Sequence, residues 1–363
     1  MEFVITISQA FLYVCFSVLL GSFLLLILPN DYRPDLKISK KVLLICAITL
    51  PIFTFIPVLN VILYMSPRFG FLDSFKLVLT TYTVGTAWDF TLFFSIVLIL
   101  LIIMARTLEE KIIASLGTVL TIGLILTIAW SSHAGALDLW MGIISDFLHL
   151  TAISVWVGIL LIIGWCSNNH QRWREFLNWF SFVAFGCFVT TALSGLLLMD
   201  VIVDEYISSW MISYGQGLLL KHLFLLPLIF YALVNSFIVK SKIAKDPLFN
   251  PIPWIRIESF ILLTIFTITA AFSQHAPPHG NYLSNEAVSP LFRLFHDDII
   301  TSSNTIGFVV NGNTVAFFFV SVLLIGLMFF ALLKKLPIVI SFLLSGLLVM
   351  SVYLMLMVTI VIR

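Results

Sequence analysis

Charged residues are scarce in this chain of 363 residues, of which Asp, Glu, Lys and Arg make up 10%. In soluble domains, charged residues make up about a quarter of the chain. The net charge of +1 also argues against nucleic acid as a partner, because a nucleic-acid-binding protein is expected to have a basic surface. No two of the four cysteines have zinc-finger or redox-motif spacing, so we interpret all four as unpaired thiols: Cys15, Cys46, Cys166 and Cys187.

The chain also lacks the short motifs of phosphate chemistry and of acyl transfer. It has no Walker motif, no G-x-G-x-x-G and no nucleophile elbow. Neither ATP-driven pumping nor hydrolysis is therefore indicated, and we expect a protein that is not an enzyme.

Hydrophobic residues are abundant instead, at 61% of the chain. A helix needs about 20 apolar residues to cross the hydrocarbon of a bilayer. Runs of this kind predict an all-α polytopic membrane protein, surrounded by lipid, with about ten transmembrane helices. They lie near residues 5–28, 42–64, 87–105, 112–132, 143–166, 177–199, 217–239, 255–273, 313–333 and 338–362.

The placement of Lys and Arg predicts the orientation of these helices. Fourteen of these residues fall in the loops on one side and four on the other, and cytoplasmic loops carry the excess. The loops around residues 29–41 and 240–254 belong to the basic side, so we predict that they are cytoplasmic. Both termini would then face outside.

Six of the seven histidines fall toward the outer side of this map, and only His170 is cytoplasmic. His133 ends the fourth span. His149 lies about two turns into the fifth, on the order of 10 Å from its outer end, and His222 is near the outer end of the seventh. Ionisable side chains at membrane depth are costly, which makes them candidates for function.

Three histidines at the outer ends of three helices predict a metal site of His133, His149 and His222, since neutral imidazole is the commonest metal ligand. Asp146 lies at i−3 from His149, on the same helix face, where it would orient the imidazole or supply an oxygen ligand. A hydrogen bond between helices is the alternative for a single membrane histidine.

The stretch "SQHAPPHG" places His275 and His279 in the outer loop after the eighth span. Pro277 and Pro278 prevent a regular helix there. The stretch is either an ordinary exposed loop or an outer capture site that hands metal to the buried histidines. Cys46 and Cys166 lie near cytoplasmic helix ends, where they are small packing residues or, since thiolates favour Cu(I), part of an inward path.

Two blocks of the sequence resemble the copper resistance D (CopD) family of bacterial inner-membrane proteins. The first is "SHAGA" followed by "DFLHLTAISVWVGILL", and the second includes "TTALSGLLL", "SYGQGLLLKHLFLLPLIFYALVN" and "AAFSQHAPPH". They cover roughly residues 130–280. The resemblance implies a multi-pass protein of the plasma membrane with an eight-helix core, which takes up or handles copper at the outer face.

The resemblance divides the chain into a helical core of residues 1–280, an extracellular loop of 281–312 and a C-terminal helix pair of 313–363. The chain has no fused copper-binding sandwich domain, so a separate periplasmic or extracellular protein would have to supply the ion.

Three functions remain open at this point. The first is a transporter that moves copper inward, as Cu(I) or Cu(II). The second is a b-type cytochrome-like electron carrier, because histidines on facing helices ligate haem. The third is an accessory protein that binds copper for metalloenzyme assembly without transporting it.

Overall fold

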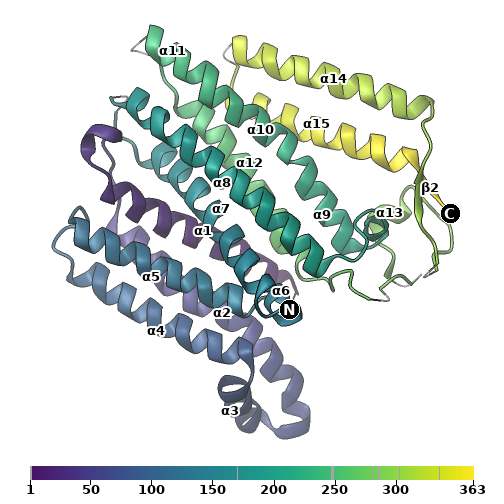
Figure 1. Cartoon of the computed structure of the whole chain (residues 1–363), viewed down its shortest axis with the longest axis horizontal. Coiled ribbons are helices and arrows are strands. Elements are labelled where there is room, and N and C mark those ends of the chain that lie inside the picture. Colours follow the sequence, from purple (N-terminus) through teal and green to yellow (C-terminus); the bar gives the residue numbers. More distant parts are fainter. Residues whose placement is uncertain are drawn as a thin grey trace. The chain divides into compact units, whose positions relative to one another are not determined.

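A computed structural model shows a protein built almost entirely from helices (Figure 1). It describes residues 2–169, 171–246, 249–280, 282–284, 287–301, 303–334 and 336–363, without the side chain of Glu2. The described residues include ten helices that are long and apolar enough to cross a membrane, as predicted. The fold is therefore that of an all-α polytopic membrane protein.

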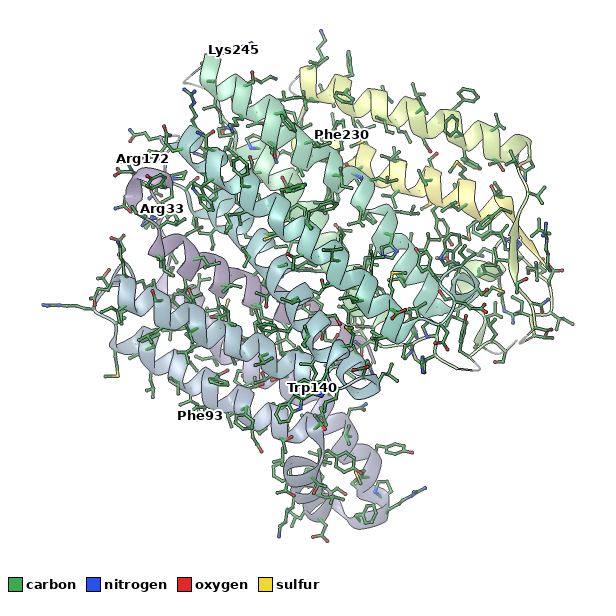
Figure 2. All side chains as sticks on the ribbon, viewed as in Figure 1. Arg33, Phe93, Trp140, Arg172, Phe230 and Lys245 are labelled. Carbon is green, nitrogen blue, oxygen red and sulfur yellow. The ribbon has the colours of Figure 1, made fainter. Side chains whose placement is uncertain are left out.

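The chain divides into two compact units, the first made of residues 1–201 and 240–251. Its helices are α1 (Glu2–Ile27), α2 (Lys40–Phe69), α3 (Phe71–Thr81), α4 (Thr83–Met104), α5 (Lys111–Trp130), α6 (His133–Leu137), α7 (Met141–Cys166), α8 (Trp173–Ile202) and α11 (Lys240–Lys245), with a 3-10 turn at Asn30–Tyr32. Helix α1 packs against α2, α5 and α7, and α4 packs against α2 and α5. Exposed apolar side chains such as Phe93 point away from this packing on α4, as a lipid-facing surface requires (Figure 2).

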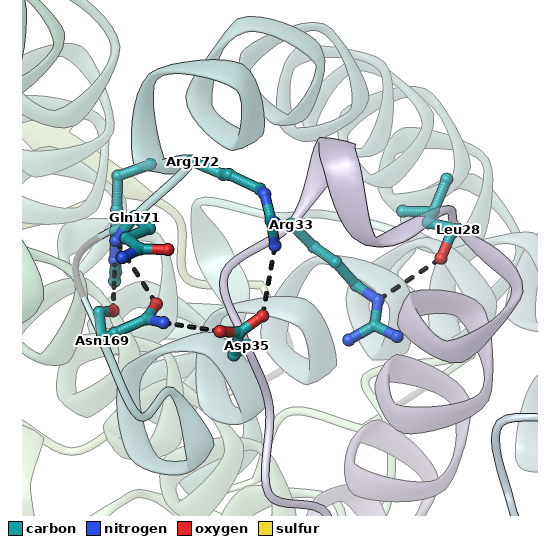
Figure 3. A network of polar contacts seen from close by, with 7 residues as sticks. Leu28, Arg33, Asp35, Asn169, Gln171 and Arg172 are labelled. Carbon is teal, nitrogen blue, oxygen red and sulfur yellow. Dashed lines mark hydrogen bonds and ion pairs between the residues drawn. The ribbon is translucent and has the colours of Figure 1, made fainter.

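Loops that we predict to be cytoplasmic meet at one end of this unit. Asp35 accepts hydrogen bonds from Asn169 Nδ2 at 2.6 Å and from Arg172 Nη1 at 3.2 Å (Figure 3). The Lys37 amide donates to the Cys166 carbonyl at 2.9 Å. The loop that follows α1 therefore contacts the loop that follows α7, and the two helices run parallel. This agrees with the predicted alternation of the spans.

The second unit comprises residues 202–239 and 252–363. Its elements are a 3-10 turn (Ser208–Met211), α9 (Ser213–Leu223), α10 (Leu225–Leu233), a π-helical segment (Val234–Val239), α12 (Ile252–Phe272), α13 (Pro290–Arg293), α14 (Gly312–Leu333) and α15 (Ile338–Thr359), with strands β1 (Ile306–Phe308) and β2 (Ile360–Ile362). Helices α14 and α15 lie side by side, and α12 packs on α9, α10 and α15 (Figure 1). The Val288 and Ile212 backbones form a bridge, so the predicted outer loop meets the start of α9.

Three elements differ from the expectation. Helix α3 lies between the second and third predicted spans, where no helix is predicted. Gly70 separates it from α2 and has a φ of 80°, which favours glycine. The seventh span is one run of 33 residues, Ser213–Lys245, interrupted by the π segment. The tenth helix ends at Thr359 because the β-branched run Ile360–Ile362 pairs antiparallel with Ile306–Phe308.

Candidate functional site

A close helix crossing positions α7, which carries Asp146 and His149. A Cβ atom at Gly158 would overlap the Ser17 carbonyl of α1, and one at Gly21 would overlap the Gly158 backbone. Ser17 and Gly21 are small residues four positions apart, a small-xxx-small spacing that allows these helices to approach closely. Such a crossing leaves little freedom to shift α7 along its axis.

The His149 imidazole is half-buried and is held from α8. Its Nδ1 lies 3.1 Å from the backbone carbonyl oxygen of Thr191 and 3.2 Å from Ser194 Oγ. A carbonyl only accepts hydrogen bonds, so Nδ1 of the neutral ring carries the proton and donates it to Thr191. The Nε2 atom then holds the lone pair, which is the arrangement found in metal-ligating histidines.

Thr191 and Gly195 also have small-xxx-small spacing, and this pair lies against the His149 ring. A Cβ atom built at Gly195 would be 3.4 Å from His149 Cε1 and 3.6 Å from Nδ1. The pair thus packs against an imidazole, with the carbonyl of one member as the hydrogen-bond acceptor.

Two other predicted residues lie near the same end of α7. His133 is exposed and opens the short helix α6, which Ser132 caps. Asp146 is half-buried one turn before His149. The Nδ1 atom of His149 has Thr191 and Ser194 as its partners, and the proposed role of Asp146 toward that ring stays a prediction.

In the second unit, the His222 ring lies against Tyr206. The Tyr206 hydroxyl is 2.7 Å from His222 Nδ1, and the two rings meet edge to face at 5.4 Å between centroids. Burial raises the pKa of the Tyr206 phenol above its ordinary value. Tyr206 therefore stays protonated at neutral pH. Its oxygen is also able to accept the Nδ1 proton when Nε2 binds a metal.

The outer segment "SQHAPPHG" is held by Asp204. One carboxylate oxygen is 3.0 Å from His279 Nδ1, and the other accepts the Gly280 amide at 2.6 Å. The Asp204 amide donates in turn to the Pro278 carbonyl at 3.1 Å. His279 and His275 are both exposed, so this loop presents two imidazoles on the side that we predict to be outer, and a carboxylate orients one of them.

Among the described residues, no three His, Cys, Asp or Glu side chains gather into a metal-binding group. His149 belongs to the first unit and His222 to the second. Ligation of one ion by both therefore stays a prediction. The prediction for His170 lies outside the described residues.

Four partners of the histidines were not predicted from the sequence: Thr191, Ser194, Asp204 and Tyr206. Asp204 and Tyr206 are polar residues between two spans, which is a weak signal because most loops contain such residues. Thr191 contributes a backbone carbonyl, for which the sequence carries no signal.

Comparisons with known families and proteins agree with the copper resemblance. Residues 174–272 match the family model of copper resistance protein D, and residues 1–143 match that of the copper resistance protein D-like N-terminal domain. The chain belongs to the copper resistance protein D family. It is a multi-pass protein of the cell membrane from a copper-handling family. The stretch with Asp146 and His149 lies between the two matched ranges, and His275 and His279 lie after them.

A similar protein is "Copper transport protein CutJ" of Bacillus subtilis (strain 168), with 35% identity over 106 residues, or 27% of this chain. The match spans 20% of that relative's length. No solved structure matches the chain.

Proposed function

We propose that the protein moves copper inward across the cell membrane, taking it from the outer face through histidine imidazoles. One observation carries this proposal. In His149, His222 and His279, Nδ1 has an oxygen partner: the Thr191 carbonyl, the Tyr206 hydroxyl and the Asp204 carboxylate. The Thr191 carbonyl and the Asp204 carboxylate only accept, so they favour the tautomer that offers Nε2 to a metal, and the Tyr206 hydroxyl is able to accept the Nδ1 proton in the same way.

The exposed and buried histidines would act in sequence. His275 and His279 would capture copper from a separate periplasmic or extracellular donor protein, and the exposed His133 lies at the end of the first unit that we predict to be outer. The half-buried residues His149 and His222 would then receive the ion, with Asp146 beside His149 as a further ligand or an orienting partner. A transport path of this kind needs sites that bind the ion and also release it.

Copper uptake into proteoliposomes tests the proposal directly. We expect His149→Ala and His222→Ala each to reduce the initial uptake rate by at least about tenfold, the lower bound for losing a residue around a metal. His170→Ala, on the side predicted to be cytoplasmic, is the control and should leave uptake unchanged. Uptake at the wild-type rate by both outer-side variants would overturn the histidine path.

Two further measurements separate the alternative functions. A Soret band in the visible spectrum of the purified protein would identify a haem carrier instead of a copper transporter. Stoichiometric copper binding without any flux would identify an accessory protein. For the transporter, binding should weaken as the pH falls from about 7.5 to 5.5, because protons compete with copper for imidazole.

The inward direction depends on the predicted orientation. Single cysteines at Asn30 and Asn250, in a cysteine-free background, should resist an impermeant thiol reagent in intact cells. Labelling at both positions would reverse the orientation and place the histidines inside.

A further inference from the structure

A carboxyl group is buried in the second unit, on a helix that is long and apolar enough to cross the membrane. Glu258 belongs to the second turn of α12 and is 2% exposed. Its neighbours on the helix, Ile255, Ile257 and Ile261, are buried as well. An ionisable side chain inside the membrane is costly, which makes it a candidate for function. The copper path through the histidines does not use this residue.

The partner of Glu258 is a buried amide from another part of the unit. Asn235 is 5% exposed, and its Nδ2 donates to Glu258 Oε2 at 2.6 Å and to the Trp254 carbonyl at 3.3 Å. Asn235 belongs to the π-helical segment Val234–Val239, which interrupts the seventh span. Such interruptions are frequent at functional sites. The irregular segment thus presents an amide to the one carboxyl group of α12.

The other end of this amide lacks a donor. Asn235 Oδ1 is buried and has no hydrogen-bond partner among the residues that the structure describes. An ionised carboxylate only accepts hydrogen bonds, whereas a protonated carboxyl group has one O–H donor. A proton on Glu258 would therefore supply the donor that Oδ1 lacks, while Nδ2 donates to the other carboxyl oxygen. Satisfaction of buried polar atoms favours this arrangement.

We propose that Glu258 and Asn235 form a binding site for one proton inside the membrane. Binding joins a proton from water to a carboxylate oxygen, so the charge of the group changes from −1 to 0 and no electron is transferred. The neutral acid–amide pair suits the apolar surroundings. Release leaves a carboxylate that Asn235 Nδ2 still holds. In the proposed inward transport of copper, on which this role rests, the site would couple passage of the ion to binding and release of a proton.

Glu258 is the only carboxylic acid on the helical elements that pack together here, all of which the structure describes. Helix α12 packs on α9, α10, the π segment and α15. Their other titratable or charged side chains, with that of α12, are Tyr214, Lys221, His222, Tyr231, Arg256 and Tyr353.

None of these six side chains is a second proton acceptor of the carboxylate kind. Those of α9 precede Asn235 by at least 13 residues, about 20 Å along a helix. Arg256 is two residues from Glu258, a spacing that places two side chains on different helix faces. The hydroxyls of Tyr231 and Tyr353 donate to the Ser341 carbonyl and to Gln216 Oε1. The site therefore binds a single proton.

Infrared spectroscopy of the reconstituted full-length protein tests the site, because a carboxylic acid has a C=O band that a carboxylate lacks. We expect this band between about pH 6 and 9, where an exposed glutamate is ionised. Glu258→Gln should remove it. Asn235→Ala should shift it to higher frequency, since the carboxyl group loses an N–H donor. Glu175→Gln is the matched control, an exposed glutamate of α8, and should leave the band unchanged.

A measurement on the unaltered sequence keeps the test valid if a variant fails to fold. Isotopic labelling of the glutamate carboxyl carbons should move the acid band of the wild type to lower frequency. Absence of an isotope-sensitive acid band over the whole pH range would overturn the proton site.

Copper uptake at one fixed external pH tests the coupling. The initial rate in wild-type proteoliposomes should depend on the internal pH, and Glu258→Gln should lose this dependence while Glu175→Gln keeps it. A dependence that survives in Glu258→Gln would refute the coupling. An acid band from Glu258 without copper uptake by the wild type would refute the proposed transport and support the proton site. Uptake without the band would do the reverse.

Discussion

The Nδ1 atom of His149 lies 3.1 Å from the backbone carbonyl oxygen of Thr191. A main-chain partner survives every side-chain substitution, so this contact fixes the tautomer whatever residue occupies position 191. The neighbouring Ser194 hydroxyl, 3.2 Å from Nδ1, is an additional partner. Ser194→Ala should consequently change copper affinity by only a few fold, whereas displacing the ring itself should have a large effect.

The first prediction displaces the ring through Gly195. Alanine at this position places its Cβ 3.4 Å from His149 Cε1, an ordinary contact, so Gly195→Ala should bind copper within about twofold of wild type. Gly195→Leu would overlap the imidazole and should weaken binding by about 10–100-fold, as losses of orienting contacts do. Equilibrium copper titration measures both. Gly186→Leu is the control on the same helix, because nothing lies within 4 Å of a Cβ built there. Equal affinity for the two leucine variants would argue against a role for His149.

The second prediction concerns Tyr206 and its 2.7 Å contact with His222 Nδ1. Tyr206→Phe keeps the ring packing and removes the hydroxyl, so the imidazole loses its oriented partner. Copper affinity should fall by about 10–100-fold. Tyr282→Phe is a matched control, since the Tyr282 hydroxyl contacts the Glu205 carbonyl at 3.5 Å rather than a histidine. If the two variants bind copper equally, the Tyr206 hydroxyl does not orient His222 for copper binding.

The third prediction tests the crossing of α1 and α7. Gly158→Ala adds a Cβ that would overlap the Ser17 carbonyl, so one helix must shift. Overpacking of this kind typically costs about 1–3 kcal/mol. Thermal unfolding in detergent should therefore occur at a lower temperature for Gly158→Ala. The control, Gly186→Ala, adds a methyl group to open space and should unfold like the wild type. Identical unfolding of both variants would mean that the crossing tolerates separation.

The sequence predicted the spans well because hydrophobic length is a local property. All ten candidate helices are present among the described residues. Helix α3 and the β1–β2 ribbon were not predicted from the sequence. The ribbon joins residues more than 50 positions apart, and the pairing partner of a short β-branched run cannot be read from the run itself.

Individual site residues were less predictable than the spans. His149 and His222 stood out because an ionisable residue in an apolar run is rare. Their partners did not, because a carbonyl at Thr191 and a hydroxyl at Tyr206 are brought to them by packing of other segments.

The fourth prediction concerns the outer loop held by Asp204. Asp204→Ala removes the partner of His279 Nδ1 and the acceptor of the Gly280 amide, so hydrogen exchange at residues 275–280 should become faster. Asp204→Asn keeps an oxygen acceptor for the amide and should preserve most of the protection. Copper captured by the loop should decrease in the order wild type, Asp204→Asn, Asp204→Ala. Unchanged exchange in Asp204→Ala would show that the carboxylate does not hold the loop.

The last prediction is a pH dependence of stability from His296, which packs against Phe292 at 4.6 Å between ring centroids. Burial lowers the pKa of His296 below its ordinary value of 6.5, although a hydrogen bond with the Met357 carbonyl and the charge of Asp298 act in the opposite direction. The unfolded chain therefore binds a proton first as the pH falls through 6.5, and stability decreases until the folded-state pKa is reached. Thermal unfolding between pH 7.5 and 5 should show a steeper loss for the wild type than for His296→Gln, which cannot titrate. Other histidines contribute to both proteins alike, so the difference between the two curves isolates His296, and parallel curves would contradict the lowered pKa.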